Sequence, residues 1–381
     1  MSQKVLLVDT GFSSQPIYQS ILDLGYDVHV VGGRPDDALA RIAEQYWCLD
    51  YSDTDKLSEL IKQENYQYIV PGCTDRSYTS CSVVGGDGAS QGIEPPENDA
   101  TINLKHCFRR LCKDLRISIP EVVTQFQHHV FPLIVKPVDG YSGNGISIVD
   151  RTEQMEEAIA LATLASPTQR YVCEQYIKGQ LFSHSAFLGQ GRVVQDFIVQ
   201  EDSTVSPFAV DLSFVIHDYP KKYLDHLRES VEKIAEYLGL QDGLVHTQFI
   251  QSGDQLYLIE MTRRCPGDLY SQLIELQTGF PYVENYVRPF LGMELNIAPL
   301  SSEPHFVIRH TVSASQGQVF TGLKFSDDFN LDRWVPLAVA GDWLDEGPRG
   351  RAGIVFIGCK DNDDLKSTYS KFSERKAYQM L

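Results

Sequence analysis

The chain has 381 residues, of which 43% are hydrophobic and 22% are charged, and its formal net charge is −18. This length and composition indicate two or three folded domains and exclude a disordered chain. The negative charge disfavours nucleic acid or an anionic membrane as a partner. No apolar run is long enough for a signal peptide or a membrane-spanning helix, and the eight cysteines lack zinc-site spacing, so we expect a cytoplasmic protein with reduced thiols.

Apolar runs and amphipathic helical patterns alternate through the first hundred residues. The runs are typical of buried strands at 4–8, 27–33 and 66–72, and the helical patterns lie at 16–26 and 55–65. Gly25 stands where a helix commonly ends. This order predicts a parallel sheet with helices on its faces and right-handed crossovers, which is a Rossmann-like unit.

A glycine-rich segment at 85–99 (GGDGASQGIEPPEND) raises the alternative of a nicotinamide-dinucleotide oxidoreductase. Its glycines are spaced G-x-G-x-x-x-G rather than G-x-G-x-x-G, and two prolines stand where a helical pattern should follow. The turn after the first strand (VDTGFSSQ) lacks the fingerprint as well. We therefore interpret the segment as a linker. Beyond it, residues 100–117 place apolar side chains on one face of a helix, and strands and helices alternate to the end of the chain.

The stretch LIVKPVDGYSGNGISIV joins two apolar runs, 133–135 and 146–149, through a glycine-bearing loop. Glycines permit positive φ and let backbone N–H groups approach a ligand closely, and several such groups around one concavity form an anion site. Lys136, at the end of the first run, would add a point charge for a phosphate. The alternative is an ordinary hairpin with a surface lysine, and this stretch alone leaves both open.

Two later segments favour the phosphate site. YVCEQYIKG (171–179) is an apolar strand that passes into a short polar hinge, where backbone groups could meet the edge of an adenine. LYLIEMTRR places Glu260 at the end of an apolar strand and Arg264 four residues later. A carboxylate beside a nucleotide supplies oxygen ligands for Mg²⁺, and an arginine there stabilises phosphate or a developing oxyanion.

Taken in order, four features resemble the ATP-grasp superfamily: NLKHCFRRL with its lysine, Lys136 with its glycine loop, the EQYIKG hinge, and GLVHTQF…LYLIEMTRR. The likeness is greatest to its carboxylate–amine ligases, the branch of biotin carboxylase, purine-pathway ligases and amino-acid ligases. It covers nearly the whole chain and implies a mixed α/β and α+β fold. The implied parts are a Rossmann-like preATP-grasp domain over 1–98, a two-part ATP-grasp domain over 99–300 with its smaller lid part at about 120–180, and a small β-rich C-terminal α+β domain over 301–381.

The resemblance implies ATP as the nucleotide and assigns its contacts. Two lysines would contact the α- and β-phosphates, the glycine loop would close over the γ-phosphate, the hinge would meet the adenine, and two apolar side chains would sandwich the ring. In that order the residues are Lys105 and Lys136; Gly140, Ser142, Gly143 and Gly145; Glu174, Gln175, Tyr176 and Ile177; Ile134 and Leu258.

The resemblance also implies Mg²⁺, held by Glu260, with Arg264 and Lys136 in catalytic roles. The family usually has a second magnesium carboxylate where this chain has Gln248 (HTQF), and an asparagine where it has Thr262. A glutamine carbonyl can ligate Mg²⁺ but carries no charge. Three alternatives follow: Asp268 compensates, a single metal suffices, or the protein binds nucleotide with weak or no turnover.

The implied activity is that of an ATP-dependent ligase that forms an amide or peptide bond through an acyl phosphate. Its partners would be a small carboxylic acid and an amine, with amino acids as candidates, and a homodimer is the candidate assembly. Candidate substrate contacts lie in the third domain or at the ends of the amino-terminal strands, where ligands gather in such sheets: Arg309, Arg351, Thr74 and Arg76.

Overall fold

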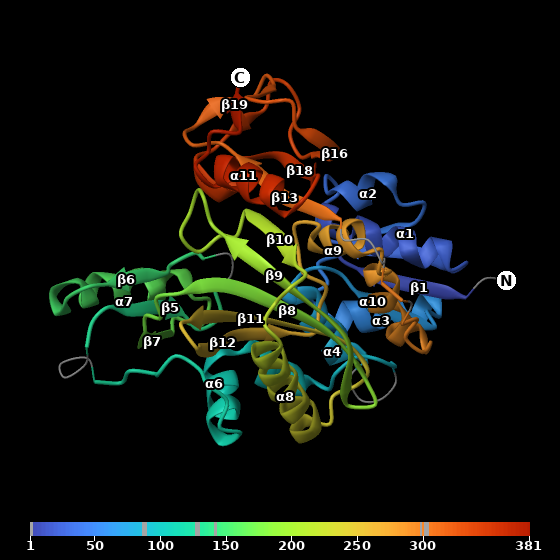
Figure 1. The fold of residues 1–381 in the computed structure, drawn as a ribbon. Helices are drawn as coiled ribbons and strands as arrows, with labels where there is room; N and C mark the ends of the chain where they lie inside the picture. The colour runs from blue at the N-terminus through green and yellow to red at the C-terminus, as the bar shows by residue number, and fades with distance from the viewer. Residues whose placement is uncertain (1–2, 86–89, 126–129, 141–142, 298, 301–304) are drawn as a thin grey trace.

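The computed structural model describes residues 3–85, 90–125, 130–140, 143–297, 299–300 and 305–381. Figure 1 shows an amino-terminal domain at one side, a lid at the opposite side, a long twisted sheet between them, and the C-terminal part above. Within the described residues, no helix combines the length and the apolar character needed to cross a membrane.

The amino-terminal domain is a parallel four-stranded sheet in the order β3-β2-β1-β4. Its strands are β1 (Lys4–Val8), β2 (Asp27–Gly32), β3 (Tyr46–Cys48) and β4 (Tyr68–Pro71), and its helices are α1 (Gln15–Asp23), α2 (Ala38–Ile42), α3 (Thr54–Glu64) and α4 (Asp75–Gly85). The predicted Rossmann-like alternation is confirmed, because apolar β1 and β2 are buried between the helices. The three-residue edge strand β3 was not predicted.

The predicted single helix at 100–117 is wrong. Two helices occupy this region, α5 (Pro96–Asn103) and α6 (Lys105–Asp114), and the chain is extended between them at Leu104, where ψ is 116°. The linker expected at 85–99 therefore already contains the first turn of a helix. The break places Lys105 at the start of α6, where its side chain faces the central cavity.

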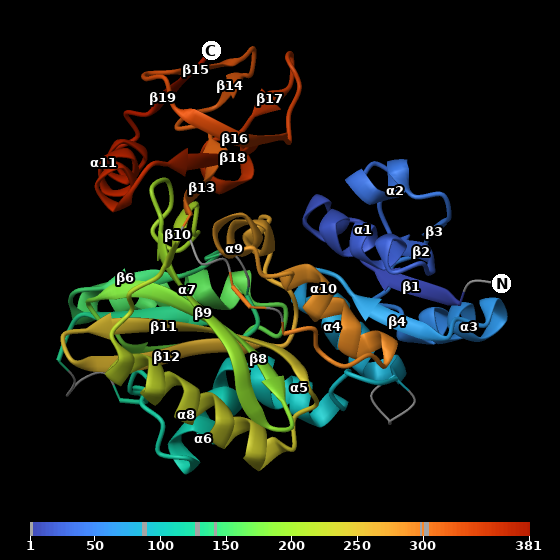
Figure 2. The same ribbon diagram turned by 45° about the vertical axis from the view of Figure 1, so that its right-hand side comes forward.

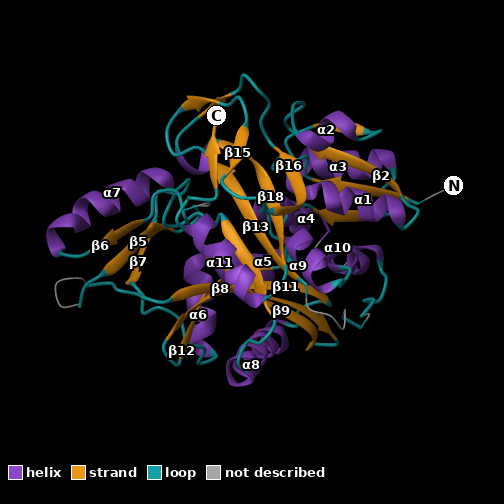
Figure 3. Ribbon diagram, turned by 45° about the horizontal axis from the view of Figure 1, so that its top comes forward, coloured by secondary structure: helices purple, strands orange, loops and turns teal. Residues whose placement is uncertain are grey.

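The lid is a three-stranded antiparallel sheet in the order β6-β5-β7, covered on one face by α7 (Met155–Ala165). The strands are β5 (Leu133–Pro137), β6 (Ser147–Val149) and β7 (Tyr171–Gln175). Leu133 and Val135 pack under α7 in a small core of their own. Since side chains alternate along a strand, Ile134 and Lys136 point to the opposite face, toward the rest of the molecule. In Figure 3 the lid projects away from the central sheet.

The central sheet has eight antiparallel strands in the order β12-β11-β8-β9-β10-β13-β18-β16. They are β8 (Gln180–Gly189), β9 (Arg192–Asp202), β10 (Leu212–Ile216), β11 (Gly243–Ser252), β12 (Gln255–Thr262), β13 (Phe306–Ser313), β16 (Asn330–Pro336) and β18 (Arg351–Cys359). Helices α6 and α8 (Lys221–Leu238) cover one face of the strands from β8 to β12 (Figure 1). The other face is left to form the floor of a cavity, beside α9 (Tyr270–Thr278) and α10 (Tyr282–Val287).

The C-terminal residues join this same sheet rather than forming a separate one. Strands β13, β18 and β16 extend it beyond β10, and α11 (Asn362–Ser373) packs on them. Two small antiparallel pairs complete this part, β14 (Gln318–Val319) with β17 (Trp343–Leu344) and β15 (Leu323–Phe325) with β19 (Tyr378–Met380). Figure 2 shows the C-terminal strands and the amino-terminal domain at two sides of the central sheet. The domain boundary near residue 300 stays a prediction, and the sheet continues across it.

Candidate active site

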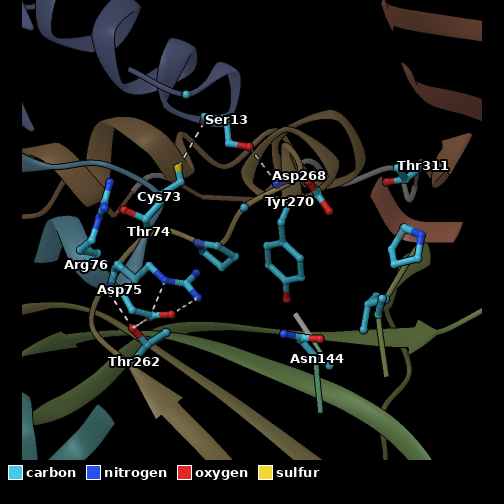
Figure 4. A pocket seen from close by; sticks show the side chains of 18 of the residues that line it. Ser13, Cys73, Thr74, Asp75, Arg76, Asn144, Thr262, Asp268, Tyr270 and Thr311 are labelled. Atoms are coloured by element: carbon cyan, nitrogen blue, oxygen red, sulfur yellow. Dashed lines mark hydrogen bonds and ion pairs between the residues drawn. The ribbon is translucent and has the colours of Figure 1, made fainter. Parts of the chain in front are cut away.

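A cavity of about 2860 Å³ lies where the four parts of the molecule meet. Its walls carry residues of the amino-terminal loops, the lid, the central sheet and the C-terminal strands. Figure 4 shows part of the wall, in which Thr74, Asp75 and Arg76 approach Thr262 from the amino-terminal side and Tyr270 points inward. Because segments far apart in the sequence build it, the cavity is a site of the whole chain rather than of one domain.

Lys136 stands at the lid face of the cavity in a buried ionic network. Its Nζ lies 2.7 Å from Oε2 of Glu174, and Nε of Arg109 lies 2.6 Å from Oε1 of the same carboxylate. Burial alone would raise the pKa of Glu174, but the two cations outweigh it and hold the pKa at about 2. Two positive charges thus share one negative charge, which leaves net positive charge at this wall for an anionic ligand.

Glu174 does not occupy the position expected for it. We expected its side chain to meet an adenine, but it is fully buried beneath Lys136 and Arg109 and does not line the cavity. The next residues do line it: Gln175, Tyr176 and Ile177. The N–H of Tyr176 donates to the carbonyl of Pro132, whereas the N–H of Ile177 has no partner among the described residues. This free donor is the kind of group that an adenine ring nitrogen would accept from.

The expected pair of apolar side chains is only half correct. Ile134 lines the cavity, whereas Leu258 turns to the opposite face of the sheet and packs in the core with Phe108 and Phe249. The cause is a β-bulge, because Phe249 pairs with Leu258 and the preceding residue, Gln248, pairs with Glu260, so that Ile259 is an extra residue. Beyond the bulge Ile259 lines the cavity in place of Leu258, and its carbonyl accepts from Nη1 of Arg109 at 2.7 Å.

The glycine loop and Lys105 lie together at the same wall. Nζ of Lys105 donates to the carbonyl of Gly140 at 3.3 Å. Gly143 and Gly145 have φ of +72° and +73°, and a Cβ at Gly143 would stand 2.7 Å from Cβ of Phe208. Only glycine fits such a backbone without strain, so the loop is held close to its neighbours. Ser142, which we also expected here, lies outside the described residues.

The expected metal residues lie at one corner of the cavity floor. Gln248 of β11 and Glu260 of β12 are direct neighbours across the two strands. Nε2 of Gln248 donates to Oε2 of Glu201 on β9 at 2.6 Å, and Glu201, which is 3% exposed, also lines the cavity. Burial raises the pKa of Glu201 to about 7, and nearby Glu260 adds to this rise against the hydrogen bonds from Ser183 and Gln248. A second carboxylate is therefore present, on a strand that we did not consider.

Arg264 is held by a residue of the amino-terminal domain. Its Nε and Nη2 lie 2.7 and 3.1 Å from the two carboxylate oxygens of Asp75, and the hydroxyl of Thr262 donates to Oδ1 at 3.3 Å (Figure 4). Burial would raise the pKa of Asp75, but Arg264 and Thr262 outweigh it and the pKa is lowered. The bidentate pair fixes the plane of the guanidinium, and Thr262 takes part in fixing it.

Arg309 and Arg351 approach the cavity from the C-terminal strands. Nε of Arg309 donates to the hydroxyl of Ser213 at 2.8 Å and Nη1 to the carbonyl of Asp268 at 2.9 Å, and no carboxylate lies within ion-pair distance in the described structure. Nη1 of Arg351 lies 2.8 Å from Oδ1 of Asp268. Asp268 is therefore engaged by Arg351, and this contact leaves Glu201 rather than Asp268 beside the metal residues.

Thr74 and Arg76 lie at the mouth of the cavity as expected. The guanidinium of Arg76 stacks over the ring of Tyr51, 4.7 Å from its centroid, and Nη1 lies 3.9 Å from Oδ1 of Asp50. Both residues are accessible to a ligand that enters between the domains. Their roles as substrate contacts stay predictions.

Three further residues of the site escaped sequence reasoning: Arg109, Asp75 and Glu201. Arg109 looked like one of several charges on an amphipathic helix. Asp75 lay in a loop already singled out, since it follows the parallel strand β4, but its partner is 189 residues away. Glu201 lies within the ordinary strand β9, and only the missing charge at Gln248 could have prompted a search for it.

The cavity has a lid that carries Lys136, a hinge in which the N–H of Ile177 has no partner among the described residues, and carboxylates on its floor. Together these features are typical of a nucleotide-binding protein. Residues 129–272 match the family model of the ATP-grasp domain. This segment therefore carries an ATP-grasp domain, and the chain resembles the carboxylate–amine ligases of the ATP-grasp superfamily. ATP-grasp ligases use ATP and Mg²⁺.

Relatives and solved structures extend this likeness over the rest of the chain. The formate-dependent phosphoribosylglycinamide formyltransferase of Corynebacterium efficiens is 23% identical over 349 residues, which are 84% of this chain and 83% of the relative. The carbamoyl phosphate synthase large chain of Saccharolobus solfataricus is 21% identical over 300 residues, and this match takes 74% of the chain but spans only 25% of that relative. The crystal structure of an L-amino acid ligase from Bacillus licheniformis superposes with a TM-score of 0.79 at 15% identity, over 100% of this chain and 98% of the other. The last likeness concerns the fold, and it confirms the expected mixed architecture.

The residues present fit both groups that the family uses. The free N–H of Ile177, together with Lys136 and Lys105, suits a nucleotide that runs from the hinge to the glycine loop. Glu260 and Glu201 have no lysine or arginine within ion-pair distance in the described ranges, and with Gln248 they offer the hard oxygen donors that Mg²⁺ prefers. The described residues contain no group of three or more His, Cys, Asp and Glu side chains arranged for a metal.

Proposed function

We propose that this protein is an ATP-dependent carboxylate–amine ligase that forms an amide or peptide bond through an acyl phosphate and releases ADP and phosphate. The observation that carries the proposal is that one cavity combines a nucleotide wall with an anion-stabilising arginine. The wall comprises Lys136, Lys105 and the hinge, and Arg264 stands beside Glu260 at the far end. No nucleophilic side chain is required, because the substrate carboxylate itself attacks.

In the first step a carboxylate oxygen of the acid attacks the γ-phosphorus of ATP, the bond to the β,γ-bridging oxygen breaks, and ADP leaves with that electron pair. Lys136 and Lys105 would hold the phosphates, and the glycine loop would exclude water from them. Bound Mg²⁺, held by Glu260 and Gln248, would neutralise charge on the phosphate oxygens. Arg309 lacks a carboxylate partner among the described residues and is suited to hold the acid.

In the second step the nitrogen of an uncharged amine attacks the acyl carbon, and phosphate leaves with the electron pair of the C–O bond. The nitrogen then loses one proton, which gives the neutral amide. Arg264 would stabilise the tetrahedral oxyanion, since Asp75 and Thr262 fix the plane of its guanidinium. The size of the cavity leaves room for two small substrates beside a nucleotide.

Release of ADP and phosphate tests this proposal. With ATP and Mg²⁺, a panel of amino acids offered as acids and as amines should contain pairs that give ADP and phosphate in equal amounts together with a new amide by mass spectrometry. The alternative is a nucleotide-binding module with weak or no turnover, which Gln248 and Thr262 favour. Tight ATP binding without ADP release across a broad panel would support that alternative.

The Asp75–Arg264 pair gives a sharper expectation for the chemical step. Asp75→Asn keeps the shape of the side chain but removes the charge that fixes Arg264, so kcat for ADP release should fall about 10- to 100-fold, which is the usual effect of a disturbed transition-state donor. The affinity for ATP, measured by calorimetry, should change less than about twofold, because Asp75 lies away from the hinge. Asp50→Asn, at the mouth beside Arg76, is the matched control. A kcat equal to that of the unaltered protein would contradict the assigned role.

A further inference from the structure

Gln248 stands where the related ligases carry a magnesium carboxylate, and its amide is not free. Nε2 of Gln248 donates to Oε2 of Glu201 at 2.6 Å, which is a short hydrogen bond to a charged acceptor. Glu201 comes from β9, two strands away in the sheet, and reaches past Ser183 of the intervening strand β8. A buried carboxylate is thus directed at the residue that lacks a charge.

This contact decides which atom of the amide faces the metal residues. The amide nitrogen of Gln248 is the atom that donates to Oε2 of Glu201, and an amide oxygen only accepts, so Oε1 of Gln248 takes no part in this contact. Oε1 of Gln248 then points away from Glu201. The neighbour on that other side is Glu260, which is paired directly with Gln248 across β11 and β12 and is exposed to the cavity.

The charges around this corner are also unbalanced. Within the described ranges, neither Glu201 nor Glu260 has a lysine or arginine partner at ion-pair distance. The nearest candidate on the C-terminal side, Arg309, donates instead to Ser213 and to the carbonyl of Asp268. Two carboxylates around one amide, neither of them in an ion pair with a lysine or arginine of the described residues, form an environment that a divalent cation would neutralise.

We propose that Gln248 and Glu201 together replace the second magnesium carboxylate, with Oε1 of Gln248 as the ligand and Glu201 as the residue that orients and polarises its amide. The proposal rests on the proposed function, because the cation is the one that accompanies the nucleotide. Glu201 is a positioning residue in this arrangement. Its negative charge, one hydrogen bond behind the ligand, restores the charge that the glutamine lacks.

Binding of Mn²⁺ in the presence of ADP, followed by electron paramagnetic resonance of the free ion, tests the arrangement without requiring turnover. Glu201→Gln keeps the size of the side chain and removes its charge, and we expect the Mn²⁺ affinity to fall about tenfold or more, as for other residues that orient a metal ligand. Gln248→Glu in the Glu201→Gln background places a carboxylate directly at the metal and should restore the affinity. A purely structural role for Glu201 would not be rescued in this way.

Two controls make the outcome decisive. Glu232→Gln removes the charge of a carboxylate on α8 that pairs with Arg192 at the surface, and it should leave Mn²⁺ affinity within about twofold of that of the unaltered protein. Binding of ADP in EDTA should be equal in all variants, which shows that they are folded. Unchanged Mn²⁺ affinity in Glu201→Gln, or no recovery in the folded double variant, would overturn the proposal. Failure of the unaltered protein to bind ADP at all would instead count against the proposed function.

Discussion

Replacing Lys136 with alanine should weaken ATP binding about 10- to 100-fold. The ammonium group is buried at the cavity wall, and a hydrogen bond between a buried charge and a phosphate contributes about 1.5–3 kcal/mol. The remaining negative charge of Glu174 would then be balanced by Arg109 alone, so the net positive charge of this wall would disappear. Calorimetric titration with ATP and Mg²⁺ measures the change directly.

The matched control is Lys233→Ala on α8, where the lysine is half exposed and contacts only Glu229 one helical turn away. That variant should bind ATP as the unaltered protein does, since a surface pair of this kind contributes little. Lys136→Ala should keep a cooperative unfolding transition, because Arg109 still pairs with Glu174. ATP affinity within threefold of that of the unaltered protein would remove Lys136 from the phosphate site.

Glu174→Gln should lower the free energy of unfolding by about 3–5 kcal/mol at pH 7, the usual cost of leaving buried charges without their partner. Lys136 of the lid and Arg109 of α6 would then face each other without the carboxylate between them. Urea unfolding measures the loss. The control Glu232→Gln disrupts a surface pair with Arg192 and should cost less than about 1 kcal/mol. If Glu174→Gln also lost less than about 1 kcal/mol of unfolding free energy, this would contradict a stabilising role of the network that Glu174 forms with Lys136 and Arg109.

The loss of stability at acidic pH provides a second test of the ionic network around Glu174. The pKa of Glu174 is about 2 in the folded protein, below its ordinary value of about 4.5, because Lys136 and Arg109 outweigh the effect of burial. A carboxylate with a lowered pKa stabilises the fold above its unfolded pKa, and this contribution, about 3 kcal/mol, is lost as the pH falls from about 4.5 to 2. Glu174→Gln should therefore show a shallower loss of stability over this window than the unaltered protein.

Local patterns were sufficient for much of the fold. The apolar runs of β1, β2 and β4 and the helices between them are visible in the sequence because each element buries one continuous stripe or strand. The lid strands and the glycine loop were visible for the same reason. The break at Leu104 was not visible in the sequence, because nothing in the residues around it interrupts the helical pattern. In the structure, the extended backbone at Leu104 separates α5 from α6.

The sequence could predict that Lys136, Glu260 and Arg264 come together at one site, because each position depends on one residue and its strand, and their roles stay predictions. Positions that depend on a partner far along the chain could not be predicted from the sequence. Leu258 was misplaced because a bulge shifts the alternation by one residue, and a bulge leaves no mark in an apolar run. The side chain of Glu174 was misassigned because its partner Arg109 is 65 residues away on a helix.

The pairing of β10 with β13 limits how the C-terminal part of this protein can change in evolution. Leu212 pairs with His310 and Ser213 with Arg309, and the N–H of Thr311 donates to the carbonyl of Asp211 at 2.7 Å beside these pairs. His310 faces the opposite side of the sheet, where it packs against Phe372. A slip of one residue would exchange the two side chains and turn the arginine away from the cavity. The pairing of β10 with β13 therefore fixes which residue of β13 faces the cavity. If the C-terminal part were exchanged between related proteins, Arg309 would keep its place at the cavity only where this register was kept as well.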